Sequence, residues 1–150
     1  MDDILQPQIT THHTYFPSPL PGAPSFSANL TRLKDTYFLW LGSGPPSSVA
    51  NGSLENEQGE EGHTSEKKLA GEWAVAMPAI GSMPITSTAL YRSTGESEPI
   101  AQRLARKFPG NQIHVSLSLA PSGSLQDPLA SKALMLVEKR VAEWISNLGI

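Results

Sequence analysis

The chain has 150 residues, about the length of one domain, and 39% of them are hydrophobic. Its formal net charge of −3 gives it no overall electrostatic attraction to nucleic acids or to anionic membranes. The absence of cysteine excludes disulfide bonds, thiolate catalysis and cysteine-based zinc sites.

The first part of the chain is predicted to form three strands. Residues 8–15 are rich in β-branched side chains, which favour a strand. Four prolines within residues 17–24 exclude regular structure and predict an extended connection. Residues 25–33 and 36–42 are predicted to pair as a β-hairpin, because the polar residues 34–35 can form a tight turn between them.

The last of these strands carries large apolar side chains on both of its faces. Because successive strand residues point to opposite sides, one face carries Phe38 and Trp40 and the other Tyr37, Leu39 and Leu41. One small sheet with two helices offers little cover for a second apolar face, so we interpret Phe38 and Trp40 as partner-binding residues. The alternative is that both faces are covered within the monomer, as in any central strand.

Residues 43–68 are predicted to be a solvated, mobile segment. They contain five glutamates against two lysines and almost no large apolar side chain. We interpret the segment as an insertion within a single domain that spans residues 1–150, because neither flanking part could bury a core alone.

Two further strands and a helix are predicted next. The strands cover residues 72–77 and 84–91, and one face of the first carries Trp73, Val75 and Met77. A helix then begins near Pro99, with Ser97 or Glu98 as its N-cap.

This helix is predicted to be amphipathic, with a basic outer side. Its apolar stripe consists of Ile100, Ala101, Leu104, Ala105 and Phe108. Arg103, Arg106 and Lys107 lie toward the other side, and we interpret them as a contact for an acidic protein partner. The alternative is a solvated helix face, which is common.

The last strand and the last helix have the clearest patterns. Residues 113–119 alternate between apolar and polar side chains, which predicts a strand with one buried face. A long helix follows, with Asp127 as its cap, Pro128 at its first position and Gly149 after its end. The order of elements predicts an α+β fold, a largely antiparallel β-sheet with flanking α-helices on one side.

Motifs for catalysis, metal binding and cofactor binding are absent. The sequence has no Gly-x-Ser-x-Gly elbow, and residues 42–46 lack the lysine of a phosphate loop. His12 and His13 are adjacent in a strand and so point to opposite faces, which does not suit a shared metal. An exposed or hydrogen-bonded role is favoured for His114, and we expect no enzyme, no metal and no cofactor. A hidden enzyme would need a deep polar pocket around His114 or His12.

The sequence also gives no sign of a membrane or nucleic-acid partner. No apolar run approaches the roughly 20 residues needed to cross a bilayer. Residues 1–7 lack the apolar core of a signal peptide, so we expect an intracellular protein. The expected location is the cytoplasm, with the nucleus as an additional alternative. RNA binding is disfavoured because exposed aromatic side chains are not interleaved with the cations of the basic helix.

Six blocks of the sequence occur in an order that carries information beyond each block. They are Ser25–Gly42, Trp73–Met77, Pro84–Thr88, Ile100–Lys107, Gln112–Ser116 and Leu136–Val141. In this order they resemble the proteasome assembly chaperone 4 family, and the run Ile100–Lys107 is the most specific of them. The acidic 43–68 insertion and the proline-rich 17–24 stretch depart from a minimal member and resemble the elaborations of a fungal-type member.

The resemblance implies a non-enzymatic role in the assembly of the 20S proteasome. It implies a heterodimer with proteasome assembly chaperone 3, which helps the α-subunits to form their ring and engages the α5 region. It also implies an antiparallel sheet with flanking helices, in agreement with the order of elements. The alternative function is a small α+β adaptor or scaffold subunit of another protein complex.

Overall fold

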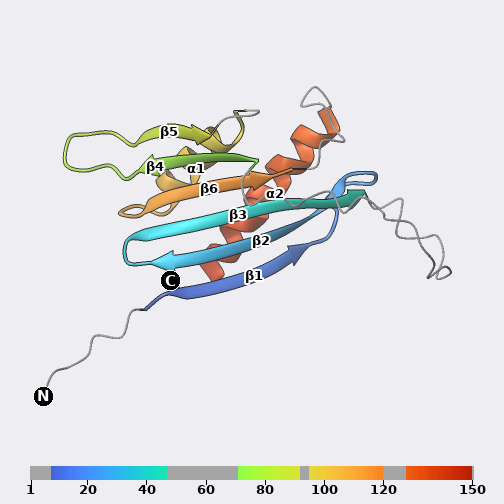
Figure 1. The fold of residues 1–150 in the computed structure, drawn as a ribbon, viewed down its shortest axis with the longest axis horizontal. Helices are drawn as coiled ribbons and strands as arrows, with labels where there is room; N and C mark the ends of the chain where they lie inside the picture. Colours follow the sequence, from blue (N-terminus) through green and yellow to red (C-terminus); the bar gives the residue numbers. More distant parts are fainter. Residues whose placement is uncertain (1–7, 47–70, 92–94, 120–127, 150) are drawn as a thin grey trace, which may run out of the picture.

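The computed structural model describes residues 8–46, 71–91, 95–119 and 128–149. These residues form six strands and two helices (Figure 1). In chain order the elements are β1 (Thr10–Phe16), β2 (Pro24–Leu33), β3 (Thr36–Pro46), β4 (Glu72–Met77), β5 (Thr86–Tyr91), α1 (Ser97–Lys107), β6 (Gln112–Ser118) and α2 (Pro128–Asn147).

The strands form one sheet in the order β1-β2-β3-β6-β4-β5. Neighbouring strands are antiparallel within β1-β2-β3 and within β6-β4-β5. The central pair of β3 with β6 is parallel, because the chain forms β4, β5 and α1 before it returns to the middle of the sheet. The predicted α+β fold with a largely antiparallel sheet is confirmed.

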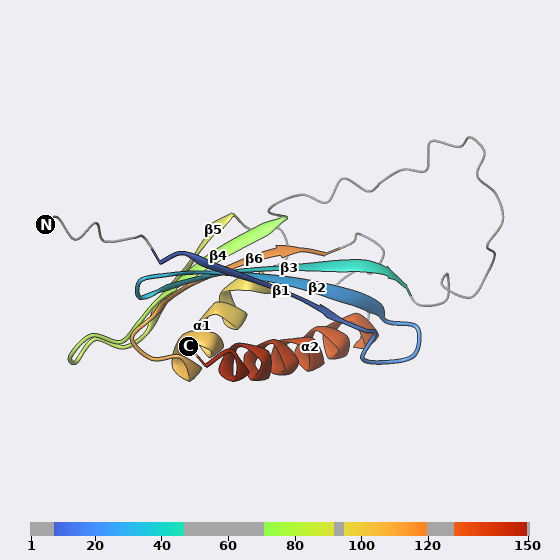
Figure 2. The same cartoon turned by 90° about the horizontal axis from the view of Figure 1, so that it is seen from below.

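Both helices lie on the same side of the sheet, as Figure 2 shows. The core fills the space between this side and the helices. Among its members, each at most 4% exposed, are Leu30, Tyr37, Leu39, Leu41, Ile113, Val115, Leu117, Val137, Val141 and Ile145. The strand residues of this core occupy every second position, as the alternating pattern predicts.

Small side chains allow α1 to lie close to β4. The helix contacts β4, β6 and β5, and its buried positions include Ala101 and Ala105. On β4 the fully buried residues that face the helix are Ala74 and Ala76. The large side chains of β4 therefore lie on the other side of the sheet, because side chains alternate along a strand.

The start of α1 is anchored by a carboxylate from β4. The backbone N–H and the hydroxyl of Ser97 both donate to Glu72 Oε1, over 2.9 and 2.8 Å. Glu72 is 2% exposed and Ser97 is fully buried. The backbone N-cap is Glu96, whose side chain makes no capping hydrogen bond. The prediction of Ser97 or Glu98 as the cap is therefore wrong, because an acceptor from a distant strand replaces a local one.

Two strand boundaries also differ from the prediction. β3 continues through residues 43–46, which were predicted to be mobile, because it still pairs there with the start of β2. β5 begins at Thr86, since Pro84 cannot donate to a strand ladder. The rest of the predicted mobile segment, residues 47–68, and the predicted cap Asp127 lie outside the described residues.

The substitution Glu72→Ala should destabilise the fold, because two buried donors of Ser97 would lose their acceptor. We expect a loss of about 2–3 kcal/mol in the free energy of unfolding, measured by urea denaturation. Glu143→Ala removes an exposed carboxylate of α2 and is the matched control, with an expected change below about 0.5 kcal/mol. Equal losses in the two variants would contradict the anchoring role of Glu72.

Candidate functional site

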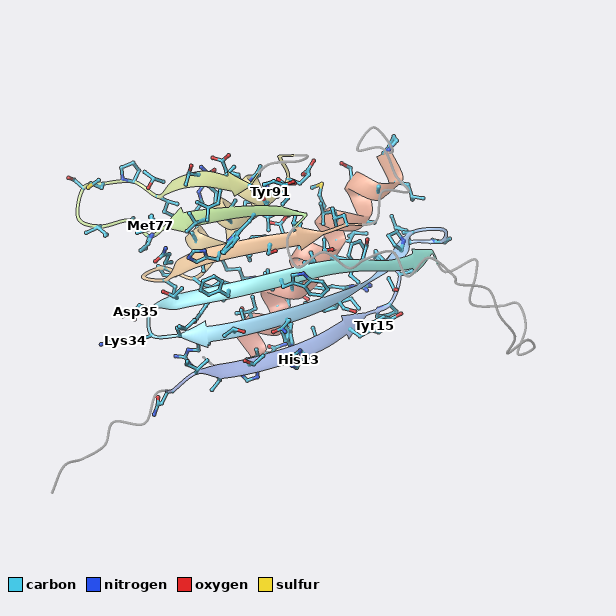
Figure 3. The ribbon with its side chains drawn as sticks, viewed as in Figure 1. His13, Tyr15, Lys34, Asp35, Met77 and Tyr91 are labelled. Carbon is cyan, nitrogen blue, oxygen red and sulfur yellow. The ribbon has the colours of Figure 1, made fainter. Side chains whose placement is uncertain are left out.

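The side of the sheet opposite the helices is the candidate functional site and is called the open face below. Two rows of side chains cross all six strands on this face. The first row is His13, Asn29, Trp40, Ser116, Trp73 and Tyr91, and the second is Thr11, Thr31, Phe38, His114, Val75 and Thr88. Figure 3 looks onto the open face, with His13 and Tyr15 along one edge and Met77 and Tyr91 toward the other.

The open face carries no formal charge in the strands that the structure describes. Two charged residues occur within these strands, and both belong to the helix side. Arg32 pairs with the buried Tyr37, and Glu72 pairs with the buried Leu117. An antiparallel sheet that leaves one face in water normally makes that face polar. Here it consists of aromatic, aliphatic, hydroxyl and amide side chains, which suit burial against another protein.

An aromatic cluster occupies the centre of the open face. The ring of Phe38 stacks on the imidazole of His114, with centroids 4.1 Å apart and planes 14° apart. Trp73 packs edge-on against Phe38 at a centroid distance of 6.2 Å, and its Nε1–H donates to His114 Nδ1 over 3.3 Å. The three rings come from β3, β4 and β6, so they tie the two halves of the sheet together at the surface.

The contacts of His114 define its protonation state. Because Nδ1 accepts the hydrogen bond from Trp73, the proton of the neutral ring lies on Nε2. The amide nitrogen of Gln112 lies 3.1 Å from Nε2. A 180° rotation of the carboxamide, which exchanges its nitrogen and oxygen, places the oxygen where it accepts this proton. Burial lowers the pKa of His114 below its ordinary value of 6.5. A second protein on this face would exclude more water and lower the pKa further.

Trp40 lies flat along its own strand, beside the aromatic cluster. A Cβ atom at Gly42 would collide with the Trp40 ring, so glycine is required two positions further along the strand. Trp40 Nε1 and the Oδ1 atom of its cross-strand neighbour Asn29 are buried without a hydrogen-bond partner in the described part of the chain. Each such group costs about 1–3 kcal/mol.

A shallow hollow beside Trp40 is lined by Ser27, Gly42, Ser43, Gly44 and Ser118, none of which is an acid, a base or a metal ligand of the usual kinds. Among the described residues no group of three or more His, Asp or Glu could hold a metal ion. His13 lies on the open face and His12 on the helix side, as predicted for adjacent strand residues.

No described helix is both long and apolar enough to span a membrane.

The three cations predicted to bind a partner differ in their surroundings. Arg103 forms a two-pronged ion pair with Glu138 of α2, with Nε–Oε1 at 2.6 Å and Nη2–Oε2 at 2.7 Å. The hydrogen bond to Glu138 raises the pKa of Arg103 above its already high ordinary value. Arg106 and Lys107 are exposed in the last turn of α1. Arg103 thus joins the two helices, whereas the other two cations face solvent.

Sequence patterns placed Phe38 and Trp40 on one face of their strand but missed the contact of Trp73 with His114. These residues lie in β4 and β6, which become neighbours only when β6 returns to the centre of the sheet. The available signal was the spacing: Trp73 and Val75 occupy alternate positions, and the predicted polar face of β6 begins at His114. The alternating pattern could assign the residues of β4 to one face of their strand and those of β6 to one face of theirs. It could not show that these are the same face of the sheet.

Comparison with protein-family models identifies a family for this chain. A family model described as proteasome assembly chaperone 4 matches residues 25–119, which is more than half of the chain. None of the curated proteins matches the chain. The matched region includes β2 to β6 and α1, and so it includes all three rings of the aromatic cluster.

The low pKa of His114 predicts a stability that depends on pH. The unfolded chain takes up a proton at a higher pH than the folded chain, so stability should be full above about 6.5 and fall as the pH decreases below it. Urea denaturation at a series of pH values between about 5 and 8 measures this slope. His114→Gln should flatten the slope, whereas His13→Gln at an exposed position should preserve it. An unchanged slope in the His114 variant would contradict the assignment.

Proposed function

The chain belongs to the proteasome assembly chaperone 4 family, and from this premise we propose how it takes part in proteasome assembly. It forms a heterodimer with proteasome assembly chaperone 3. The heterodimer binds α-subunits in the region of α5 and promotes formation of the α-ring of the 20S proteasome. The chain acts by binding and not by catalysis, in the cytoplasm and in the nucleus.

The charge-free open face is the observation that carries this proposal. Both helices in the described part of the chain lie on one side of the sheet, so the described elements leave its other side uncovered (Figure 2). On that surface Tyr15 and Tyr91 remain 62% and 59% exposed, although both are large aromatic residues. Aromatic residues are enriched at protein–protein interfaces, and charged residues are depleted at interface cores. The open face has both properties, so it is suited to cover by a partner.

A second β-sheet is the partner that fits the shape of this surface. The two rows of side chains extend over all six strands, which exceeds what a single peptide segment would cover. Two sheets that pack face to face lie about 10 Å apart and bury alternate residues of each strand. We therefore assign Phe38 and Trp40 to the contact with the partner chaperone. Trp73 and His114, which lie on the strands between β3 and β5, belong to the same contact.

The heterodimer is tested by light scattering behind a sizing column. The chain alone should self-associate or aggregate, because its aromatic face is uncovered. Co-expressed with proteasome assembly chaperone 3 from the same organism, it should elute as a 1:1 complex that captures α5. A monodisperse monomer that ignores both proteins would overturn the proposal and favour an adaptor role in another complex.

A new charge on the open face should block the heterodimer. Thr88 is exposed and pairs with Val75 in the second row, so Thr88→Lys leaves the fold intact but places an ammonium group in the interface. An unpaired buried charge costs about 3 kcal/mol or more, which corresponds to an affinity loss of about 100-fold.

Met135→Lys places the same charge on the outer surface of α2, where Met135 is 69% exposed, and is the matched control. Dissociation of each co-expressed complex on serial dilution, followed by light scattering, measures the difference. Equal affinities for Thr88→Lys and Met135→Lys would move the interface away from the open face.

A further inference from the structure

The β4–β5 connection, residues 78–85, forms an arm that projects beyond the sheet. Figure 1 shows it reaching past the turn between β2 and β3, and Figure 2 shows it curving toward the helix side. At its tip Ile80 and Met83 pair through two backbone hydrogen bonds of 2.9 and 3.2 Å around Gly81, whose φ is 58°. Ile85 packs against the core at the base. The tip is therefore a closed two-residue turn held by an anchored base, and not a loose loop.

The arm presents apolar side chains that contribute nothing to the core. Ile80 and Met83 at its tip are 65% and 64% exposed. No charged residue occurs between Glu72 and Arg92, so the arm has no charge of its own. Pro78 and Pro84 flank the tip and cannot donate backbone hydrogen bonds, which protects the arm against pairing with another strand. Its exposed surface is thus suited to side-chain contacts and not to strand addition.

A basic cluster lies at the same end of the molecule. The backbone N–H of Gln112 donates to Asp35 O over 2.9 Å, which places the end of α1 beside the β2–β3 turn. Ala76 at the base of the arm pairs with Ile113 in the next strand. This end therefore combines the apolar arm with three cations, Lys34, Arg106 and Lys107. One anion, Asp35 in the β2–β3 turn, lies at the same end.

This end is separate from the open face. A sheet that covered the open face would lie on the side away from the helices, whereas the arm curves toward the helix side. The exposed cations of α1 also lie in the helix layer. A second binding event is therefore sterically compatible with a dimer formed through the open face.

We infer that the β4–β5 arm and the cations Lys34, Arg106 and Lys107 form a second docking surface, for an acidic protein surface that has an apolar depression. The arm inserts Ile80 and Met83 into the depression, and the cations pair with the surrounding carboxylates. Apolar anchors surrounded by complementary charges are the usual arrangement of a specific contact, in which the charges set association rate and register. The identity of the occupant rests on the proposed function, under which it is the α5 region of the proteasome and not the partner chaperone.

The test uses the complete heterodimer with proteasome assembly chaperone 3 and purified α5 as the probe. Ile80→Ser/Met83→Ser should weaken α5 binding by about tenfold or more, because it removes both apolar anchors. Arg106→Glu/Lys107→Glu should weaken it by a similar factor and should make the remaining affinity less sensitive to salt. Neither double variant should change the 1:1 elution of the heterodimer, since both alter exposed side chains away from the open face.

Two control variants match these changes at exposed positions of α2. Met135→Ser removes an exposed methionine, and Lys132→Glu reverses an exposed cation. Both should bind α5 with the affinity of the natural chain. If the arm and cation variants also keep that affinity, the inference is overturned while the proposed function stands. A heterodimer that forms but does not bind α5 overturns the inference together with the α-subunit part of the proposed function. If the natural chain forms no heterodimer, the dimer part of the proposed function is wrong.

Discussion

The fold of the described residues is governed by a six-stranded sheet whose two helices lie on the same side. A strand in the middle of such a sheet has two faces to bury, and the helices can cover one. β3 meets this constraint with aliphatic residues and Tyr37 toward the helices and with Phe38 and Trp40 on the open face. The free energy of the helix-side core is gained within the monomer. The aromatic residues opposite are only partly buried in the monomer, and a second molecule on the open face would bury them further.

The same constraint explains the unequal distribution of side-chain volume on β4. Its alanines face α1, and this allows the helix to approach, while Trp73 and Val75 face outward. A strand that served only a monomer core would place its largest residues toward the helices. Here the tryptophan instead completes the aromatic cluster with Phe38 and His114. The packing of the monomer and the character of the open face are thus two results of one arrangement of small and large residues.

The period of the strands and helices could be predicted from the sequence because it depends on neighbours within a few residues. Alternation in residues 113–119 identified the helix side of β6, and the proline and glycine signals located α2. The parallel pairing of β3 with β6 could not be predicted, because it depends on where a later strand enters the sheet. The Glu72 cap and the Arg103–Glu138 ion pair join residues 25 and 35 positions apart, so no local pattern reveals them.

The absence of charge from the open face has an energetic consequence for association. Burying an ion costs several kcal/mol unless a partner is placed with high accuracy, whereas hydroxyl and amide groups need only a hydrogen bond. Threonine, serine and asparagine surround the aromatic cluster on β1, β2 and β6, where they keep the uncovered face hydrated. Such a face gains apolar burial at its centre and avoids ionic desolvation at its margins. The charges of the helix layer then remain available for contacts whose strength depends on salt. The open face and the proposed docking surface of the arm and its cations thus differ in chemistry as well as in position.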